Sequence, residues 1–147
     1  MKKCIIIYSK TGNTRSVANR LNEVLSCDFF EVKATSDNPS IQNVELTEVP
    51  QVGDYDHLVF ASPVHGFSLS HVMNTYLNQL PDLSEKTVDL FITHHFPFAW
   101  MGGNRTLKQM KKIIENKNGT VRYTTSVNWS SKKRESDISN MIHTYHS

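Results

Sequence analysis

The chain has few of the residues that would indicate a membrane, secreted or metal-binding protein. Its 147 residues include only two cysteines, Cys4 and Cys27, which match no metal-ligand spacing and which we expect to be unpaired thiols. No apolar run approaches the ~20 residues that a bilayer-spanning helix needs. The basic start at Met1, Lys2 and Lys3 is followed by too short an apolar stretch for a secretion signal. We therefore expect a cytoplasmic protein with no membrane partner.

The chain also has no large excess of positive or negative charge. The formal net charge is +2, the calculated pI is about 8.5 and 20% of residues are charged. Basic residues gather at 108–112 and 132–134, but they lack the interleaved aromatic residues of a nucleic-acid surface. We interpret both groups as solvated helix faces and expect no nucleic-acid partner. The length is that of a single domain over residues 1–147.

Several familiar active-site motifs are absent. There is neither a Walker A ending of Gly-Lys-Ser/Thr nor a Gly-x-Gly-x-x-Gly fingerprint, which disfavours nucleoside triphosphates and dinucleotides. No Cys-x5-Arg phosphatase loop exists, and a phospho-receiver's acidic pair is replaced by Tyr8 and Ser9. The pair His94 and His95 has no carboxylate or cysteine at ligand spacing, so we interpret these side chains as loop histidines beside a ligand and expect no metal.

Strand and helix patterns do alternate along the chain. Apolar runs predict strands at residues 4–8, 29–32, 57–61, 88–93 and 121–127. Helical spacing of apolar residues predicts helices around 17–25, 69–80, 107–114 and, as a short last helix, 138–145. This alternation predicts an α/β fold, a doubly wound five-stranded parallel sheet with helices on both faces. Periodicity lapses between residues 35 and 55, where we expect a connection with little or no helix.

The most informative segment follows the first predicted strand. Hydroxyl and amide side chains crowd around one glycine, immediately before a helix: Ser9, Lys10, Thr11, Gly12, Asn13, Thr14. Such a loop offers backbone N–H groups, side-chain donors and the positive end of the helix dipole to a phosphate. An ordinary N-cap is the alternative, but a cap needs only one of these residues.

This segment resembles the FMN phosphate loop of flavodoxins. The resemblance implies the flavodoxin strand order 2-1-3-4-5, with FMN where the loops after the first, third and fourth predicted strands converge. It also implies that hydroxyls and amides bind the phosphate, while Lys10 and Arg15 remain solvated. The basic pI departs from the family, whose members are typically acidic.

The other two loops contain residues suited to holding a flat ring. After the third predicted strand come Ser62, Pro63, Val64, His65, Gly66, Phe67 and Ser68; after the fourth come Thr93, His94, His95, Phe96, Pro97, Phe98, Ala99, Trp100, Met101, Gly102, Gly103. Exposed aromatic residues in a loop need a surface to cover. An isoalloxazine ring is one such surface; an aromatic mini-core or a patch for a partner protein is the alternative.

The flavodoxin resemblance assigns roles within these loops. Gly66 matches the glycine whose peptide turns toward flavin N5 when the flavin is reduced, a rotation that glycine permits. His65 falls at the stacking position, which is a departure; alternatively, His65 points to solvent and Phe67 or Trp100 stacks. Met101, Gly102 and Gly103 resemble the small-residue segment beside the ring. Residues 102–109 are also similar to flavodoxin-like domains fused to ferredoxin modules, although no cysteine-rich iron–sulfur segment is present here.

The expected function is therefore that of an FMN-binding electron carrier, a monomer or weak dimer that exchanges electrons with a reductase and an acceptor protein. An FMN-dependent NAD(P)H:quinone-type oxidoreductase is the main alternative. The chain lacks long insertions that would build a substrate pocket, which favours the carrier. A binding module that has lost its flavin is a third possibility, and the intact loop at residues 9–14 argues against it.

Overall fold

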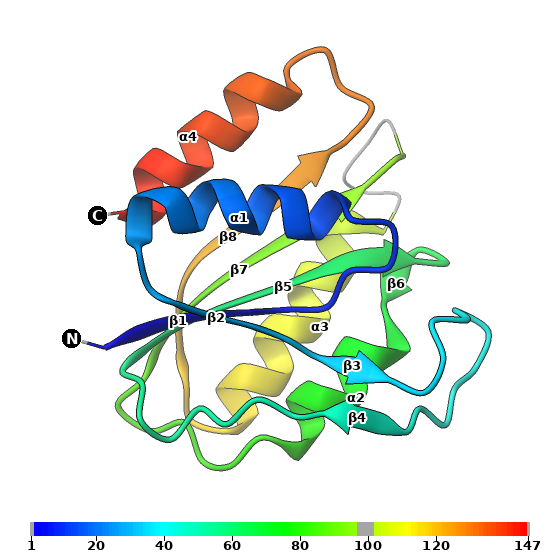
Figure 1. The fold of residues 1–147 in the computed structure, drawn as a ribbon, viewed down its shortest axis with the longest axis vertical. Helices are drawn as coiled ribbons and strands as arrows, with labels where there is room; N and C mark the ends of the chain where they lie inside the picture. The colour runs from blue at the N-terminus through cyan, green and yellow to red at the C-terminus, as the bar shows by residue number, and fades with distance from the viewer. Residues whose placement is uncertain (1, 97–101, 147) are drawn as a thin grey trace.

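Five parallel strands form the centre of the computed structural model, which describes residues 2–96 and 102–146. They are β1 (Lys3–Ile7), β2 (Asp28–Glu31), β5 (His57–His65), β7 (Thr87–His94) and β8 (Thr120–Asn128), and their order in the sheet is β2-β1-β5-β7-β8 (Figure 1). Counted along the parallel strands alone, this is the predicted order 2-1-3-4-5.

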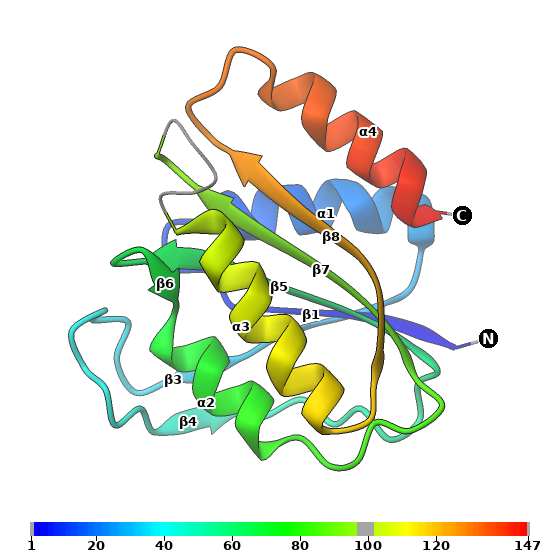
Figure 2. The same ribbon diagram turned by 180° about the vertical axis from the view of Figure 1, so that it is seen from behind.

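Helices cover both faces of the sheet, as the alternation predicted. Helices α1 (Asn13–Leu25) and α4 (Arg134–His146) lie on one face, while α2 (His71–Gln79) and α3 (Gly103–Asn116) lie on the other (Figures 1 and 2). The three central strands β1, β5 and β7 are buried on both sides, with one hydrophobic cluster under each helix pair. In the described segments, no helix is both long and apolar enough to cross a membrane.

Three details differ from the alternating pattern. Residues 32–56 contain no helix, as expected, but β3 (Lys33–Ala34) and β4 (Leu46–Glu48) pair there as a small antiparallel ribbon. A two-residue strand, β6 (Ser68–Leu69), turns back to pair antiparallel with the end of β5. Helix α4 has 13 residues, so the expectation of a short last helix was wrong.

The two cysteines are free thiols on opposite sides of the sheet. Cys4 is in register with Asp28, and it packs in the α2–α3 cluster. Cys27 precedes Asp28 by one residue and packs on the α1–α4 cluster instead, because successive side chains of a strand alternate between faces. Burial raises the pKa of the Cys4 thiol to about 12.

A buried carboxylate joins three strands near the end of the sheet opposite the predicted loops. Asp89 of β7 is fully buried, 2.7 Å from His57 Nε2 on β5 and 2.8 Å from Arg122 Nη2 on β8. The backbone N–H of Tyr123 donates to the same carboxylate at 3.1 Å. Burial by itself raises the pKa of Asp89, but the hydrogen bonds and charges of His57 and Arg122 outweigh it and hold the pKa below its ordinary value.

Candidate cofactor site

The three loops at the carboxyl ends of β1, β5 and β7 converge, as the sequence predicted. The hydroxyls of Thr14 and Thr93 share a buried hydrogen bond of 2.8 Å, which joins the start of α1 to the end of β7. The Asn13 amide donates to Nε2 of His95 at 3.1 Å. Pro63 of β5 is in register with Thr93, so the third and fourth loops also start side by side.

The loop after β1 is organised around the Ser9 hydroxyl. Ser9 Oγ accepts hydrogen bonds from the backbone N–H of Gly12 at 3.2 Å and of Arg15 at 3.3 Å. Gly12 is the N-cap of α1 and has no side chain to cap it, so the Ser9 hydroxyl supplies a cap from outside the helix, through the Arg15 amide. The amides of Asn13 and Thr14 lie in the first turn of the helix, so they have no intrahelical acceptor. Their N–H groups form the positive end of the helix dipole. This donor set fits a phosphate group.

Side chains of the same loop divide between solvent and structure. Lys10 and Thr11 are exposed, and the Thr11 hydroxyl is available to a ligand. Arg15 binds the Glu31 carboxylate with its Nε and Nη2, at distances down to 2.8 Å, so its guanidinium is already paired. Thr14 is buried against Thr93, so its hydroxyl positions the loop rather than facing a ligand.

The loop after β5 is a tight hairpin. His65 pairs with Ser68, which leaves Gly66 and Phe67 as the two turn residues. Their φ angles are +56° and +65°, the pattern of a type I′ turn. Glycine adopts this conformation without strain, whereas a phenylalanine with positive φ is strained. The hairpin therefore stores strain at a residue beside the predicted ring site.

Aromatic side chains of two loops stack on one another. The rings of Phe67 and Phe96 lie 4.5 Å apart between centroids with planes 25° apart, and His94 stacks on Phe96 at 6.3 Å. Phe67 is still 48% exposed. The sequence left open whether these aromatics cover a flavin or each other, and here Phe67 and Phe96 cover each other. A flat ring placed between them would need one of them to move.

Gly102 brings the loop after β7 against the hairpin. Its φ is +118°, and a Cβ built on it would lie 2.7 Å from the Phe67 Cα and 2.9 Å from the Phe67 carbonyl carbon and oxygen. Only glycine permits this backbone contact. Gly103 then begins α3 in a buried position.

Two histidines at this end of the sheet are buried enough to lose part of their basicity. His94 is 4% exposed, burial lowers its pKa, and its Nδ1 has no hydrogen-bond partner in the part of the chain that is described. Burial, followed by the charges of Lys10 and His71, also lowers the pKa of His65, whose ring meets the edge of Tyr8 at 6.0 Å. A buried nitrogen without a hydrogen-bond partner, at the point where the loops after β1, β5 and β7 meet, fits a site whose remaining hydrogen bond is made by a cofactor.

Comparison with known proteins decides the family. The model of the flavodoxin domain matches residues 4–125. This chain belongs to the flavodoxin family.

Solved structures with low sequence identity share the flavodoxin fold. A flavoprotein from Lactobacillus acidophilus, solved with FMN, is 16% identical with a TM-score of 0.67, over 95% of this chain and 97% of that one. Oxidised flavodoxin 2 from Bacillus cereus is 13% identical with a TM-score of 0.70, over 99% and 97%. An NADH:FMN oxidoreductase is 15% identical with a TM-score of 0.67, over 99% and 89%. No curated protein matches this chain.

Within this flavodoxin-family fold, some predicted site residues serve the scaffold. The Ser62 hydroxyl is bonded to Ser70, the N-cap of α2, and Val64 packs on the core. Phe98, Trp100 and Met101 lie outside the described residues, so their predicted contacts stay predictions.

The sequence interpretation missed two residues beneath the hairpin. Tyr8 is buried beside His65 and its hydroxyl donates to Asp37 at 3.2 Å. Burial, with the Asp37 charge and hydrogen bond, raises the pKa of Tyr8 to about 12. Asp37 lies in the irregular stretch after β3, and no local pattern connects it with β1.

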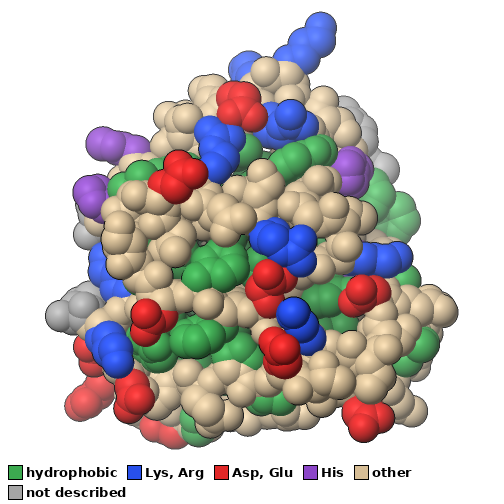
Figure 3. All heavy atoms as spheres, in the orientation of Figure 1, with side chains coloured by type: hydrophobic (Ala, Val, Ile, Leu, Met, Phe, Trp, Pro, Cys, Tyr) green, Lys and Arg blue, Asp and Glu red, His purple; other side chains and the backbone are tan. Residues whose placement is uncertain are grey.

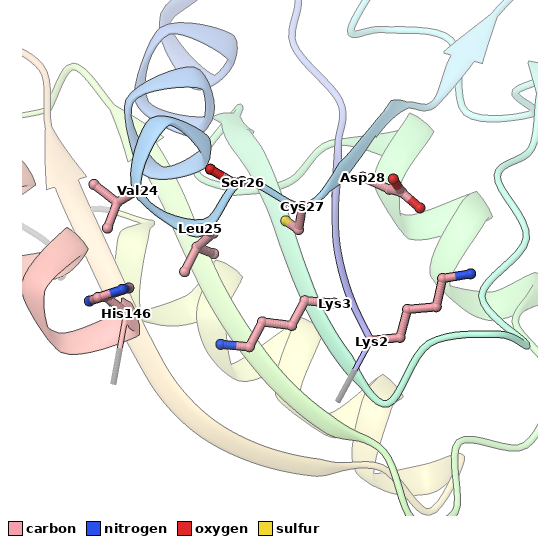
Figure 4. Close-up of a pocket in the computed structure, with 8 residues that line it drawn as sticks. All are labelled: Lys2, Lys3, Val24, Leu25, Ser26, Cys27, Asp28 and His146. Atoms are coloured by element: carbon pink, nitrogen blue, oxygen red, sulfur yellow. The ribbon is translucent and has the colours of Figure 1, made fainter.

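A surface hollow of about 410 Å³ lies at the opposite end of this flavodoxin-family sheet, beside the start of β1 and β2 (Figure 4). The ammonium groups of Lys2 and Lys3 diverge there, so they do not converge on one anion. The Cys27 thiol donates to Asn22 Oδ1 at 3.3 Å, and burial raises its pKa. Across the described residues, no group of three or more His, Cys, Asp or Glu side chains could hold a metal.

Proposed function

We propose that this protein binds FMN at the loops after β1, β5 and β7 and carries electrons between redox proteins. The observation that carries the proposal is the N-terminus of α1, where the Ser9 hydroxyl binds the amides of Gly12 and Arg15 and leaves those of Asn13 and Thr14 without an intrahelical acceptor. A phosphate is the group that such a donor set attracts most strongly.

The flavin would supply the one- and two-electron chemistry, and the protein would set its surroundings. In this proposal the amides of Thr11, Asn13 and Thr14 and the Thr11 hydroxyl hold the phosphate. His65 and the aromatic pair Phe67 and Phe96 lie beside the ring, where they exclude water from part of it. His94 Nδ1, which is buried and has no hydrogen-bond partner among residues 2–96 and 102–146, would bond a polar atom of the ligand.

The hairpin at Gly66 suits a site that changes with redox state. A peptide rotation between Gly66 and Phe67 would change the strained φ of Phe67, while glycine tolerates either arrangement. The strain at Phe67, of order 1–3 kcal/mol, therefore makes the turn easier to rearrange than an unstrained turn.

Two observations favour a carrier over a reductase. The connection between β2 and β5 contains only the small β3–β4 ribbon, so it adds no insertion that would build a substrate pocket. Phe67 and Phe96 also lie against each other beside the ring site, where a reductase would keep a pocket for its second substrate. Because an NADH:FMN oxidoreductase has a similar fold, an FMN-dependent reductase is the competing function.

The phosphate assignment is tested by comparing FMN with riboflavin. We expect the wild-type protein to bind FMN far more tightly, because riboflavin leaves the loop amides without their anion. Thr11→Ala removes one donor to a charged group and should weaken FMN about tenfold, with little effect on riboflavin. Thr47→Ala, an exposed threonine on β4, is the control. Equal affinities for FMN and riboflavin in a fluorescence-quenching titration would exclude the phosphate site.

The carrier and the reductase are separated by steady-state kinetics. With FMN bound and a quinone as acceptor, we expect NADH and NADPH to be oxidised only slowly. Turnover of about 1–10³ per second, the range typical of enzymes, would favour the reductase instead.

A further inference from the structure

Helix α3 carries more positive charge than the whole chain. Its residues Gly103–Asn116 include four cationic side chains and one acidic side chain, a net of +3. The chain has a net charge of +2, so everything outside α3 sums to −1. The basic character of this protein is therefore concentrated on one helix.

The cationic side chains of α3 make no ion pair with the described residues, whereas arginines outside α3 do. In the described parts of the chain, no ion pair involves Arg105, Lys108 or Lys112. By contrast, Arg20 pairs with Glu135 and Arg122 pairs with Asp89. Figure 3 shows the opposite face of the molecule, that of α1, where Lys and Arg side chains lie interspersed among Asp and Glu.

These unpaired cations lie along a single exposed stripe. We name the basic face of α3 by the five residues that line a shallow hollow of about 530 Å³: Asn104, Arg105, Lys108, Gln109, Lys112. The hydrophobic side of the helix faces the sheet, and the stripe points away from it. Lys111 is equally exposed but does not line the hollow.

The basic face is fixed to the proposed flavin site by two contacts. Gly102, immediately before α3, lies against the backbone of Phe67. Further along the helix, Gln109 Oε1 accepts a hydrogen bond of 2.9 Å from the backbone N–H of Leu69 on β6. Figure 2 shows the start of α3 beside β6. A protein seated on the basic face would therefore lie close to the hairpin, where Phe67 is exposed.

We propose that the basic face of α3 docks a redox protein whose electron-transfer face is acidic, which rests on the proposed FMN function. Complementary charge attracts such a partner and orients it before contact, and the apolar Phe67 lies where water must leave the interface. In one encounter the partner's metal cluster loses one electron and the flavin gains it; two encounters reduce one FMN by two electrons.

The probe for this docking is an acidic plant-type [2Fe–2S] ferredoxin. Its oxidised form is titrated into the oxidised, FMN-loaded protein by calorimetry, so that binding is measured without turnover. Lys108→Glu/Lys112→Glu reverses two charges of the basic face. Lys33→Glu/Lys111→Glu is the matched control, because it changes the net charge by the same amount at exposed positions outside the hollow.

We expect the first variant to bind the ferredoxin at least about tenfold more weakly than wild type at low salt, and the control to lose less than about threefold. The difference should shrink as the Debye length falls from ~30 Å at 0.01 M salt to ~8 Å at 0.15 M. Equal losses in both variants, no saturable ferredoxin binding to wild type, or equally tight binding of basic cytochrome c or duplex DNA would overturn the proposal.

Failure of the function itself is distinguished by FMN binding. If wild type binds FMN and the charge reversal has no specific effect on ferredoxin, only the docking surface is wrong. If wild type binds no FMN in the fluorescence titration, the proposed function fails and the redox docking fails with it.

Discussion

From the contact between Gly102 and Phe67 we predict how far a Gly102 substitution lowers the free energy of unfolding. Gly102→Ala places a methyl group 2.7 Å from the Phe67 Cα and 2.9 Å from its carbonyl carbon and oxygen. These are backbone atoms, so no side-chain rotation relieves the overlap. The two loops must separate, or α3 must shift.

Two costs add in this variant. Holding alanine at positive φ costs about 1–2 kcal/mol, and forcing an extra methyl into a packed contact costs about 1–3 kcal/mol more. The free energy of unfolding should therefore fall by about 2–5 kcal/mol, which corresponds to a urea midpoint lower by roughly 1–2 M.

Variants of two other glycines distinguish the cost of the positive φ from the cost of the steric overlap. Gly66 has φ +56° but open space around its Cβ position, so Gly66→Ala should cost only the conformational part, about 1–2 kcal/mol. Gly53 does not have a positive φ, and no atom lies within 4 Å of the position its Cβ would take. Gly53→Ala should therefore change the free energy of unfolding by less than about 0.5 kcal/mol.

Urea unfolding followed by circular dichroism measures all three variants under the same conditions. We expect the order of destabilisation Gly102→Ala, then Gly66→Ala, then Gly53→Ala, and we expect Gly102→Ala also to weaken FMN because its loop and the hairpin separate. If Gly102→Ala were no less stable than Gly66→Ala, the backbone contact that joins the two loops would be refuted.

Two further predictions concern titrating groups. Asp89→Asn should lower the free energy of unfolding by about 3 kcal/mol at neutral pH, because it leaves the guanidinium of Arg122 without its buried carboxylate. The pKa of Asp89 in the folded protein is held below the ordinary value of an aspartate, so its contribution to stability is complete above that ordinary pKa and is lost as the pH falls further. Wild type should thus lose more stability than Asp89→Asn between pH 5 and pH 3 in urea titrations; parallel losses would contradict this role. His65, whose pKa burial lowers, should bind a proton more readily when the flavin becomes anionic on reduction, so the midpoint potential should fall as pH rises between about pH 5 and 8. Potentiometry of His65→Phe should show a weaker pH dependence, and an unchanged slope would remove His65 from the flavin's surroundings.

The alternation of elements was predictable because it depends on local pattern. A run such as residues 57–61, apolar throughout, suits a parallel strand buried on both faces, and helical spacing after it gives the covering helix. The loop at residues 9–14 was equally readable, since its donors are neighbours in sequence and precede a helix.

Contacts between loops were not predictable in the same way. Thr14 and Thr93 are separated by 79 residues, and both threonines were predicted as ligand residues although they bond to each other. Phe96 was recognised as an exposed aromatic in need of a surface, yet only the fold shows that Phe67 supplies one. A hydroxyl or an aromatic ring has the same sequence signature whether its partner is a cofactor or another loop.

The sequence by itself thus determined the layers of this protein and the end of the sheet where its site lies, because hydrophobic periodicity and loop composition are local properties. The tertiary structure alone decided which donors remain free for a phosphate, that Gly102 must be glycine, and that Arg105, Lys108 and Lys112 form one stripe with no ion pair in the described part of the chain. Those properties depend on how distant segments pack and on which charges find partners, and packing is settled only when the whole chain folds.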